Sequence, residues 1–329
     1  MTLLQRFKHK LFARRSVPAQ TNSEPDLALA SEHWAARARQ QRDATLPSSW
    51  AESPLVINEH INPLVSGKPD RGWLEAVAVN YFPEPVNRCL SLGCGGGGLE
   101  RHGLQLGICT HFDAFDVSAG AVDIAIEEAT KVDLADKIDY QVANLNELVL
   151  PPDTYDAVFA SQSAHHIEAL EFYMQQVSNS LKEGGLFIVN EFVGPNQFQW
   201  TDKQLRLAND MLESIPEQYR YCIREEGFKQ SIERPTIAAM NAYDPTEAIC
   251  SQDILPLLNT HFDLVEQRDF GGTLLHLVLD NIAGNLEADE EGKAILRDLI
   301  RQERELLEQG EISSDFTLIV VRKKPAQSA

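Results

Sequence analysis

The feature that most constrains the fold of this 329-residue chain is a short apolar run that ends in a cluster of glycines. Residues 89–98 read Cys-Leu-Ser-Leu-Gly-Cys-Gly-Gly-Gly-Gly. A buried strand that runs directly into a glycine turn is typical of nucleotide-binding α/β folds, because residues without a Cβ atom let the backbone turn tightly and approach a ligand. The loop also satisfies the dinucleotide pattern G-x-G-x-x-G, and a glycine turn without a ligand is a further alternative, so the cofactor stays open at this point.

Further strand-like segments follow the glycine loop and alternate with helical patterns. Residues 111–115 end at Asp116, and a carboxylate at the tip of a second strand can accept hydrogen bonds from ribose hydroxyls. Residues 140–146 contain the polar Asn144, which suits an adenine edge. A fourth and a fifth strand are predicted at residues 155–160 and 186–189. Several cofactors contain a ribose, so Asp116 does not choose between them.

The order of five motifs narrows the choice of cofactor. The segments LSLGCGGG, FDVS, VANLNEL, YDAVFASQSAHHI and LKEGGLFIVNEF follow one another within residues 88–192. In this order they resemble the class I S-adenosylmethionine-dependent methyltransferases. The resemblance implies an α/β, doubly wound, Rossmann-like seven-stranded sheet with an antiparallel last strand, and S-adenosylmethionine as the cofactor. It is closest in character to small-molecule O-methyltransferases, including those that act on sugars.

The resemblance implies a cofactor site along the carboxyl edge of the sheet. Its predicted residues are Gly93, Cys94, Gly95, Gly97, Asp116, Val117, Asn144, Leu145 and Ser161. Two positions depart from the family. Ser91 stands where the family usually has an acid, and Asn144 stands where it often has Asp. Asn144 can still bind adenine, accepting through its carbonyl oxygen.

A catalytic pair is predicted after the fourth and fifth strands. His165 is the candidate general base, because an imidazole titrates near neutrality, and Glu191 would orient the ring. The alternative is that either histidine only hydrogen-bonds the loop backbone, with His166 the more structural of the two; which of them is the base stays open. We predict no metal site, because adjacent histidines in a loop need not converge and no other cluster has metal-ligand spacing.

The amino-acid composition indicates which partners the protein binds and in which cellular compartment it lies. The net charge of −20 argues against nucleic acid as a partner. Five cysteines, an odd number, fit a reducing cytoplasm, and no signal-peptide core or 18-residue apolar run is found. Residues 1–17 carry five basic side chains and no acid, so we expect either a peripheral contact with an anionic membrane, on its inner face, or a solvated basic tail. The oligomeric state is not predicted.

The predicted organisation has five parts. A basic tail and linker covers residues 1–30, helices preceding the core cover 31–80 with Ser31 as a helix cap, and the cofactor-binding core covers 81–192. A helical cap insertion covers 193–260, and residues 261–329 return to the sheet around a second helical insertion at 271–315. Phe198 and Trp200 favour an acceptor contact for the cap; an oligomer interface is the alternative.

The predicted function is methyl transfer from S-adenosylmethionine to an oxygen of a small molecule or saccharide, in saccharide biosynthesis such as a cell-surface glycan pathway. Two alternatives come from other classes. One is an NAD-dependent oxidoreductase that uses the same glycine loop. The other is a non-catalytic S-adenosylmethionine-binding partner of another enzyme, which would not need His165 and Glu191.

Overall fold

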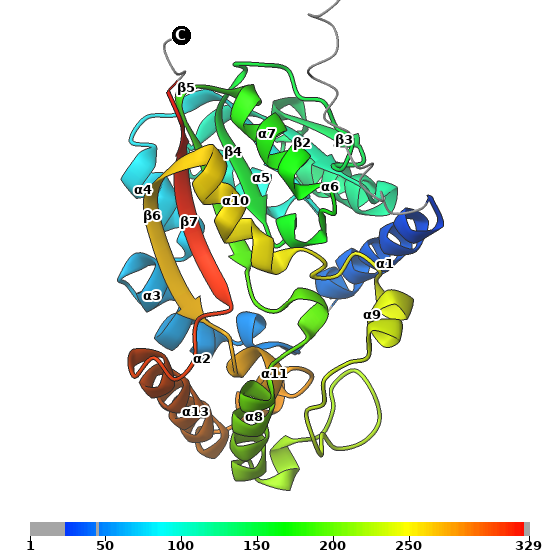
Figure 1. Ribbon diagram of the computed structural model, residues 1–329, viewed down its shortest axis with the longest axis vertical. Coiled ribbons are helices and arrows are strands. Elements are labelled where there is room, and N and C mark those ends of the chain that lie inside the picture. Colours follow the sequence, from blue (N-terminus) through cyan, green and yellow to red (C-terminus); the bar gives the residue numbers. More distant parts are fainter. Residues whose placement is uncertain (1–23, 44–45, 326–329) are drawn as a thin grey trace, which may run out of the picture.

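The computed structural model describes residues 24–43 and 46–325 and centres on one seven-stranded sheet (Figure 1). The strands are β1 Val86–Leu92, β2 Cys109–Asp116, β3 Ile138–Val142, β4 Tyr155–Ser161, β5 Leu181–Phe192, β6 Phe262–Gly271 and β7 Phe316–Lys323. Their order across the sheet is β3-β2-β1-β4-β5-β7-β6. The last strand, β7, runs antiparallel to β5 and to β6, and the remaining pairs are parallel. The predicted doubly wound α/β sheet is confirmed.

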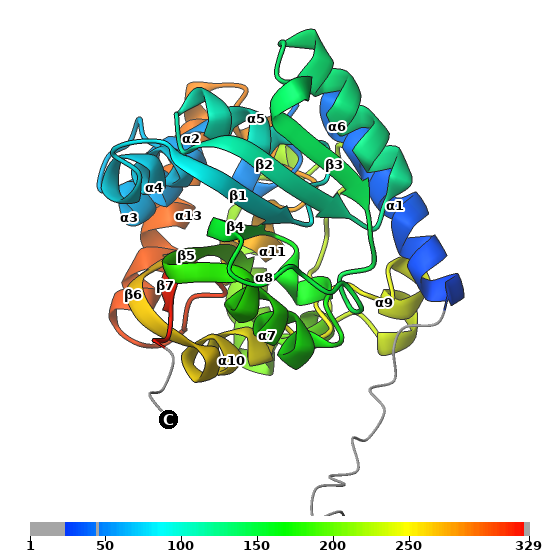
Figure 2. The ribbon, with the colours of Figure 1, turned by 90° about the horizontal axis from the view of Figure 1, so that it is seen from above.

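Helices cover both faces of the sheet, because the central strands are buried on both sides. In β4, Ala157 and Phe159 pack into one hydrophobic cluster, and Val158 and Ala160 pack into the other. The first face carries α4 Trp73–Tyr81, α5 Gly98–Gln105 and α6 Ala119–Lys131; the second carries α7 Leu170–Ser180 and α10 Ile254–His261 (Figure 2). Because strands β1 to β5 run parallel, their carboxyl ends share one edge, which lies toward the lower half of Figure 1.

A group of helices, here called the cap, lies beyond that edge. It consists of α8 Asp202–Ser214, α9 Ile237–Tyr243, α11 Leu275–Leu279, α12 Ala283–Leu286 and α13 Glu290–Glu308. The short helix α2 Pro54–Val56 contacts α13 of the cap, and α3 Asn62–Ser66 lies beside β6 (Figure 1). Helices are therefore present in both predicted insertions, and α13 is the longest helix of the second. The α10 helix, expected in the cap, instead covers the sheet beside α7.

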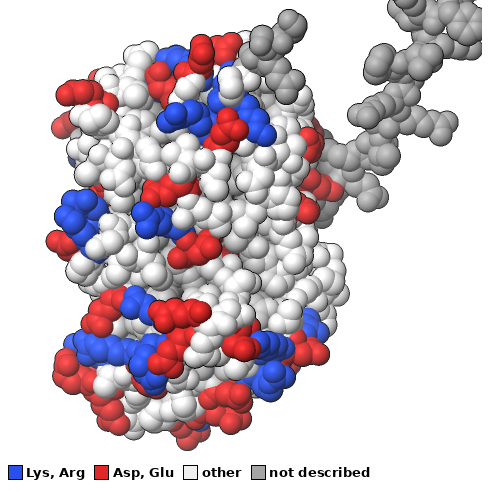
Figure 3. Space-filling model, turned by 60° about the vertical axis from the view of Figure 1, so that its left-hand side comes forward, with Lys and Arg blue, Asp and Glu red and all other residues white. Residues whose placement is uncertain are grey.

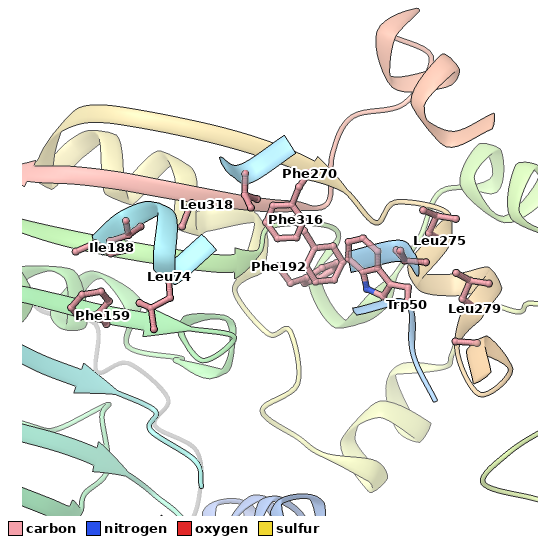
Figure 4. Packing of buried hydrophobic residues seen from close by; sticks show 14 of the residues in the cluster. Trp50, Leu74, Phe159, Ile188, Phe192, Phe270, Leu275, Leu279, Phe316 and Leu318 are labelled. Carbon is pink, nitrogen blue, oxygen red and sulfur yellow. The ribbon is translucent and has the colours of Figure 1, made fainter. Parts of the chain in front are cut away.

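One hydrophobic core joins the sheet to the cap (Figure 4). The ring of Trp50 stacks on Phe270 and is tilted against Phe316, with centroid distances of 6.1 and 5.0 Å. Leu275 and Leu279 of α11 belong to the same cluster. The cap is thus packed on the sheet through large buried side chains.

A buried carboxylate also holds the cap. Glu303 of α13 is completely buried. Its Oε1 accepts a hydrogen bond from the Gly272 N–H at 2.8 Å, and its Oε2 accepts from the N–H groups of Leu274 and Leu275 at 2.7 and 2.8 Å. These are N–H groups at the start of α11, which have no acceptor within their own helix. Glu303 therefore fixes the direction in which the chain leaves β6.

The amino-terminal boundary differs from the prediction. Helix α1 runs Glu24–Asp43, so residues 24–30 are helical and do not belong to a linker. Ser31 lies inside this helix and is not its cap; its carbonyl accepts a hydrogen bond from Ser118 Oγ at 2.8 Å. Pro25 did not prevent the helix, because the N–H groups of a first turn have no intrahelical acceptor to lose.

Residues 1–17, for which a membrane contact is predicted, lie outside the described residues. Within residues 24–43 and 46–325, no helix combines the length and the apolar character needed to cross a bilayer.

Candidate active site

A cavity of about 310 Å³ lies at the carboxyl ends of the central strands, between the glycine loop and helix α1. It is here called the cofactor cavity, because most of the predicted cofactor residues line it. Gly93 and Gly95 line it with φ of 80° and 51°, a left-handed backbone that favours glycine. A Cβ atom on Gly93 would lie 2.3 Å from the Cβ atom of Ser163. The loop thus needs glycine both for its turn and for its close contact with the chain after β4.

Asp116 joins the glycine loop to the second strand at this cavity. Its Oδ2 accepts a hydrogen bond from the Gly95 N–H at 2.8 Å, and its Oδ1 accepts from the Ser118 N–H at 2.8 Å. The side chain is buried, and burial raises the pKa of Asp116. Each carboxylate oxygen has a second lone pair, so Asp116 can hold the loop and accept from a ribose hydroxyl as well.

The other predicted cofactor residues are placed as follows. The cavity is lined by Gly93, Cys94, Gly95, Asp116, Val117, Asn144, Leu145 and Ser161, which is the predicted set without Gly97. Gly97 is instead the residue before α5, and a Cβ atom there would lie 2.4 Å from Tyr140 Oη. A glycine is needed at position 97 so that the start of α5 can pack against Tyr140.

The carbonyl oxygen of Asn144 already accepts two hydrogen bonds from Asn146, so its expected use as the adenine acceptor is not supported.

A second cavity, of about 1380 Å³, adjoins the first and lies under the cap. Trp34 and Gln162 line both cavities and form their common wall. Gln162 follows β4 with φ of 52°, and its N–H donates to the Asn190 carbonyl at 2.8 Å. A left-handed backbone is strained at a residue other than glycine, and such strained conformations cluster at functional sites.

The predicted catalytic pair comes together where the two cavities meet. His165 Nδ1 lies 2.5 Å from Glu191 Oε2, and both side chains are buried. Glu191 Oε1 also accepts from the backbone N–H groups of Ser163 and Ala164 at 2.5 and 2.6 Å. Glu191 therefore orients the histidine ring and holds the turn that carries it.

The role of His165 as a general base is not supported. Burial acts against a charge on the ring, but the carboxylates of Glu191 and Glu247 together outweigh burial and raise the pKa of His165 to about 10. A ring that is protonated at neutral pH has no lone pair with which to accept a proton. In this state His165 is a positioning residue.

Sequence reasoning missed a third member of this group, Glu247, which lies between α9 and α10. Its Oε1 is 3.4 Å from His165 Nε2. Burial opposes ionisation, but the neighbouring His166 and His165 lower the pKa of Glu247 to about 2. No spacing in the sequence could have found Glu247, because it follows a different segment, eighty residues after the histidines.

The structure also corrects the reasoning on metals. One ligand nitrogen from His165, one from His166 and a carboxylate oxygen of Glu247 all lie within 4.8 Å of one another. The two adjacent histidines do converge, because the short 3-10 turn Ala164–His166 brings their rings to a centroid distance of 4.2 Å.

Helix α1 completes the wall of the cofactor cavity. Trp34 Nε1 donates a hydrogen bond to Asp244 Oδ2 at 3.1 Å, and its ring meets His166 edge-on at 5.0 Å. Leu27 and Ala30 of the same helix line the cavity. The amino-terminal helix thus closes the cofactor cavity and contacts the segment that carries Glu247.

Residues 90–189 match the family model described as "Methyltransferase domain". The sterol 24-C-methyltransferase of Clavispora lusitaniae is 28% identical over 149 residues, which cover 43% of this chain and 38% of that protein. The ubiquinone/menaquinone biosynthesis C-methyltransferase of Rhizobium rhizogenes is 24% identical over 135 residues, which cover 40% of this chain and 52% of that protein. The match thus spans about half of these relatives or less.

Solved structures agree on the fold. Geranyl diphosphate C-methyltransferase from Streptomyces coelicolor, in complex with Mg²⁺, geranyl-S-thiolodiphosphate and S-adenosyl-L-homocysteine, superposes with a TM-score of 0.52 at 12% identity, covering 93% of this chain and all of that chain. A geranyl diphosphate methyltransferase in complex with GPP and sinefungin gives 0.51 at 13% identity, covering 91% and 100%. Residues 90–189 therefore form a methyltransferase domain, for which S-adenosylmethionine is the cofactor, and the chain shares its fold with these solved methyltransferases.

Proposed function

We propose that this protein transfers the methyl group of S-adenosylmethionine to a carbon of a large, mainly apolar acceptor of the isoprenoid class. The observation that carries the proposal is the acceptor cavity of about 1380 Å³ that adjoins the cofactor cavity at Trp34 and Gln162. Typical small-molecule pockets measure about 300–1,000 Å³, so this cavity suits an acceptor larger than a single sugar.

The lining of the cavity favours an apolar acceptor. Aromatic and aliphatic side chains of the lining include Trp34, Trp50, Ile57, Ile61, Val65, Trp73, Phe192, Phe198, Trp200, Met240, Phe270, Leu277 and Phe316. Phe198 and Trp200, predicted to contact the acceptor, stack with a centroid distance of 5.3 Å and an interplanar angle of 8°. A cavity of this composition gains its binding energy from burial of apolar surface.

The chemistry is compatible with this lining. The methyl group leaves the sulfonium with both electrons of the carbon–sulfur bond staying on sulfur, and the new bond uses two electrons of the acceptor. An alkene acceptor carbon would leave a neighbouring positive charge until a proton departs, and aromatic faces stabilise such a charge. Alignment of donor and acceptor is the main contribution of the protein to a displacement of this kind.

The names of the relatives support the same class. The sterol and the ubiquinone/menaquinone enzymes are C-methyltransferases, and the structural neighbours act on geranyl diphosphate. Methylation of a saccharide oxygen, expected from the sequence, is the second candidate. It is favoured by the polar and charged groups on the cavity wall, which include His165, Asn190, Glu247, Arg224, Glu225, Lys229, Glu233 and Asp280. Aromatic and aliphatic side chains outnumber these groups in the lining.

A nucleic-acid partner is not proposed. On the face drawn in Figure 3, acidic and basic side chains lie side by side and the basic ones form no continuous region. The whole chain has a net charge of −20, and this face offers no basic region that could neutralise a phosphate backbone.

The test is a label-transfer screen. The purified chain is incubated with S-adenosylmethionine carrying a ¹³C-methyl group and with one acceptor at a time: a polyprenylated phenol, a sterol, geranyl diphosphate or a sugar glycoside. Mass spectrometry detects transfer, and NMR distinguishes a carbon-bound from an oxygen-bound methyl group. We expect transfer to carbon of an isoprenoid-bearing acceptor. Transfer to the glycoside alone, with the label on oxygen, would overturn the proposal.

A further inference from the structure

His165, His166 and Glu247 form a compact cluster of metal-ligating side chains at the junction of the two cavities. One ligand atom from each lies within 4.8 Å of the other two. His165 and Glu247 line the acceptor cavity, and His166 lines the cofactor cavity. A group bound by all three would therefore lie between the transferred methyl group and the acceptor.

The outer nitrogens of both histidines already have oxygen partners. His165 Nδ1 lies 2.5 Å from the Glu191 carboxylate, and His166 Nδ1 lies 3.0 Å from Thr246 Oγ1. The Thr246 hydroxyl donates its own proton to Asp244 Oδ1 at 2.7 Å, so toward His166 it can only accept. Both rings thus carry the Nδ1 proton. The second ring proton of His165, on the Nε2 atom that faces Glu247, would leave when a metal ion binds, because metal ligands must be deprotonated; Nε2 of each ring can then bind the ion.

This arrangement is the one that oriented metal ligands show. A metal-binding histidine almost always donates its second ring N–H to a carboxylate or another oxygen acceptor, which fixes the tautomer and the direction of the ring. Glu191 and Thr246 supply these two acceptors here, and Asp244 in turn fixes Thr246.

One inner atom of the cluster has no partner, and another belongs to a carboxylate. His166 Nε2 is buried and has no hydrogen-bond partner among the described residues. The Glu247 carboxylate lies 3.4 Å from His165 Nε2, and its side chain is 12% exposed. A buried nitrogen without a hydrogen-bond partner is costly, and a cation bound to it and to the Glu247 carboxylate would remove that cost.

We propose that His165, His166 and Glu247 bind a divalent transition-metal ion of the Zn²⁺ type, and that this ion holds an anionic oxygen of the acceptor, either a phenolate or a phosphate oxygen. Two imidazoles and one carboxylate are a donor set that Zn²⁺ takes in catalytic sites, where three protein ligands leave a coordination position open. The ion site stands on the cluster alone; the acceptor oxygen rests on the proposed function.

A second cluster of the same residue types offers a matched control. His111, Asp113 and Asp139 also bring their ligand atoms within 4.8 Å of one another. There, however, the charge is already balanced, because Arg88 binds both oxygens of Asp113 at 2.9 and 2.7 Å and Tyr155 donates to the same carboxylate. We assign no metal to this cluster.

The experiment measures metal binding without activity. Full-length protein treated with a chelator is titrated with Co²⁺, followed by visible absorption, and with Zn²⁺, followed by calorimetry. We expect one ion per chain, and a loss of affinity of about 100-fold or more in Glu247→Gln. Thr246→Val, which removes only the outer partner of His166, should weaken binding about 10–100-fold. His111→Asn should bind like the parent.

Folding of each variant is checked by circular dichroism and by binding of S-adenosylhomocysteine, which Glu247→Gln should retain. Three results would each overturn the metal site. They are parental Zn²⁺ affinity in folded Glu247→Gln, loss of Zn²⁺ binding in His111→Asn alone, and no ion bound by the parent.

The acceptor oxygen is tested on the Co²⁺-loaded protein with two soluble probes, a simple phenol and pyrophosphate. A change in the Co²⁺ spectrum with phenol assigns a phenolate, and a change with pyrophosphate assigns a phosphate. No change with either overturns the oxygen ligand and leaves the metal site standing. Label transfer by metal-free protein at the parental rate would overturn the metal's role but not the proposed function.

Discussion

The cofactor side and the acceptor side of this molecule are built in different ways. The cofactor cavity is lined mainly by residues at the ends of consecutive strands, from Gly93 to Ile167, with one helix added at the amino terminus. The acceptor cavity takes its wall from segments scattered between His33 and Phe316. The first relies on backbone geometry in a continuous stretch, and the second relies on tertiary packing. Mutations on the two sides should therefore differ in what they impair.

The largest effect is expected where packing of the cap depends on a single buried group. Glu303→Ala leaves the N–H groups of Gly272, Leu274 and Leu275 buried without an acceptor. We expect a loss of about 3–5 kcal/mol in the free energy of unfolding, measured by urea denaturation. Glu308→Ala, exposed on the same helix, is the control and should change stability by less than about 0.5 kcal/mol. A loss below about 1 kcal/mol in Glu303→Ala would mean that the cap holds without it.

On the cofactor side, a buried acid should make stability depend on pH. Glu100 in the first turn of α5 is completely buried, and both of its carboxylate oxygens lack a partner among the described residues. Burial raises the pKa of Glu100 to about 7. The unfolded chain therefore loses this proton near its ordinary pKa of about 4.3, before the folded chain does. Stability should fall as pH rises from about 4.5 to 7 and stay lowered above that.

Glu100→Gln removes this titration. At pH 8 we expect the variant to be more stable than the parent by on the order of 2–3 kcal/mol, and at pH 4 the two should be nearly equal. Chemical denaturation at a series of pH values provides the comparison. Parallel pH profiles for variant and parent would show that Glu100 finds a partner in solution.

Asp116 tests the cofactor side directly. Asp116→Ala should weaken binding of S-adenosylhomocysteine by about 1.5–3 kcal/mol in calorimetry, because a charge-assisted hydrogen bond is lost. The acceptor KM should stay near the parental value. Asp123→Ala, an exposed residue on the following helix, serves as the control. Unchanged affinity in Asp116→Ala would remove Asp116 from the cofactor site.

The smallest effect is expected at the aromatic wall of the acceptor side. Trp200→Leu keeps an apolar side chain but loses the stack with Phe198. We expect the acceptor KM to rise about 3–10-fold, corresponding to about 0.5–1.5 kcal/mol, with cofactor affinity unchanged. Tyr221→Leu, which removes an exposed aromatic outside the cavity, should leave both parameters alone. A loss of cofactor affinity in Trp200→Leu would show that the two sides are not separable.

Eight of the nine residues predicted to bind the cofactor from sequence patterns line one cavity. Gly93 and Asp116 end neighbouring strands, so their meeting follows from the parallel sheet. Gly97 was predicted with the same set but does not line the cavity, because a glycine run does not distinguish a residue that faces a ligand from one that faces a helix. His165 and Glu191 were brought together as expected, but the charge balance that decides their role also depends on Glu247, which no spacing connects to them.

The sequence by itself determined the parallel strands and the edge at which the predicted cofactor residues gather, because buried parallel strands are continuous apolar segments whose carboxyl ends must share one edge. Only the tertiary structure decided which side chains complete the site. Glu247, Thr246 and Trp34 come from segments with no common period, and they meet because the cap and helix α1 bury their apolar faces against the sheet. Burial then makes their few polar groups costly to leave unpaired, and this cost is the physical reason that they converge on the histidines after β4.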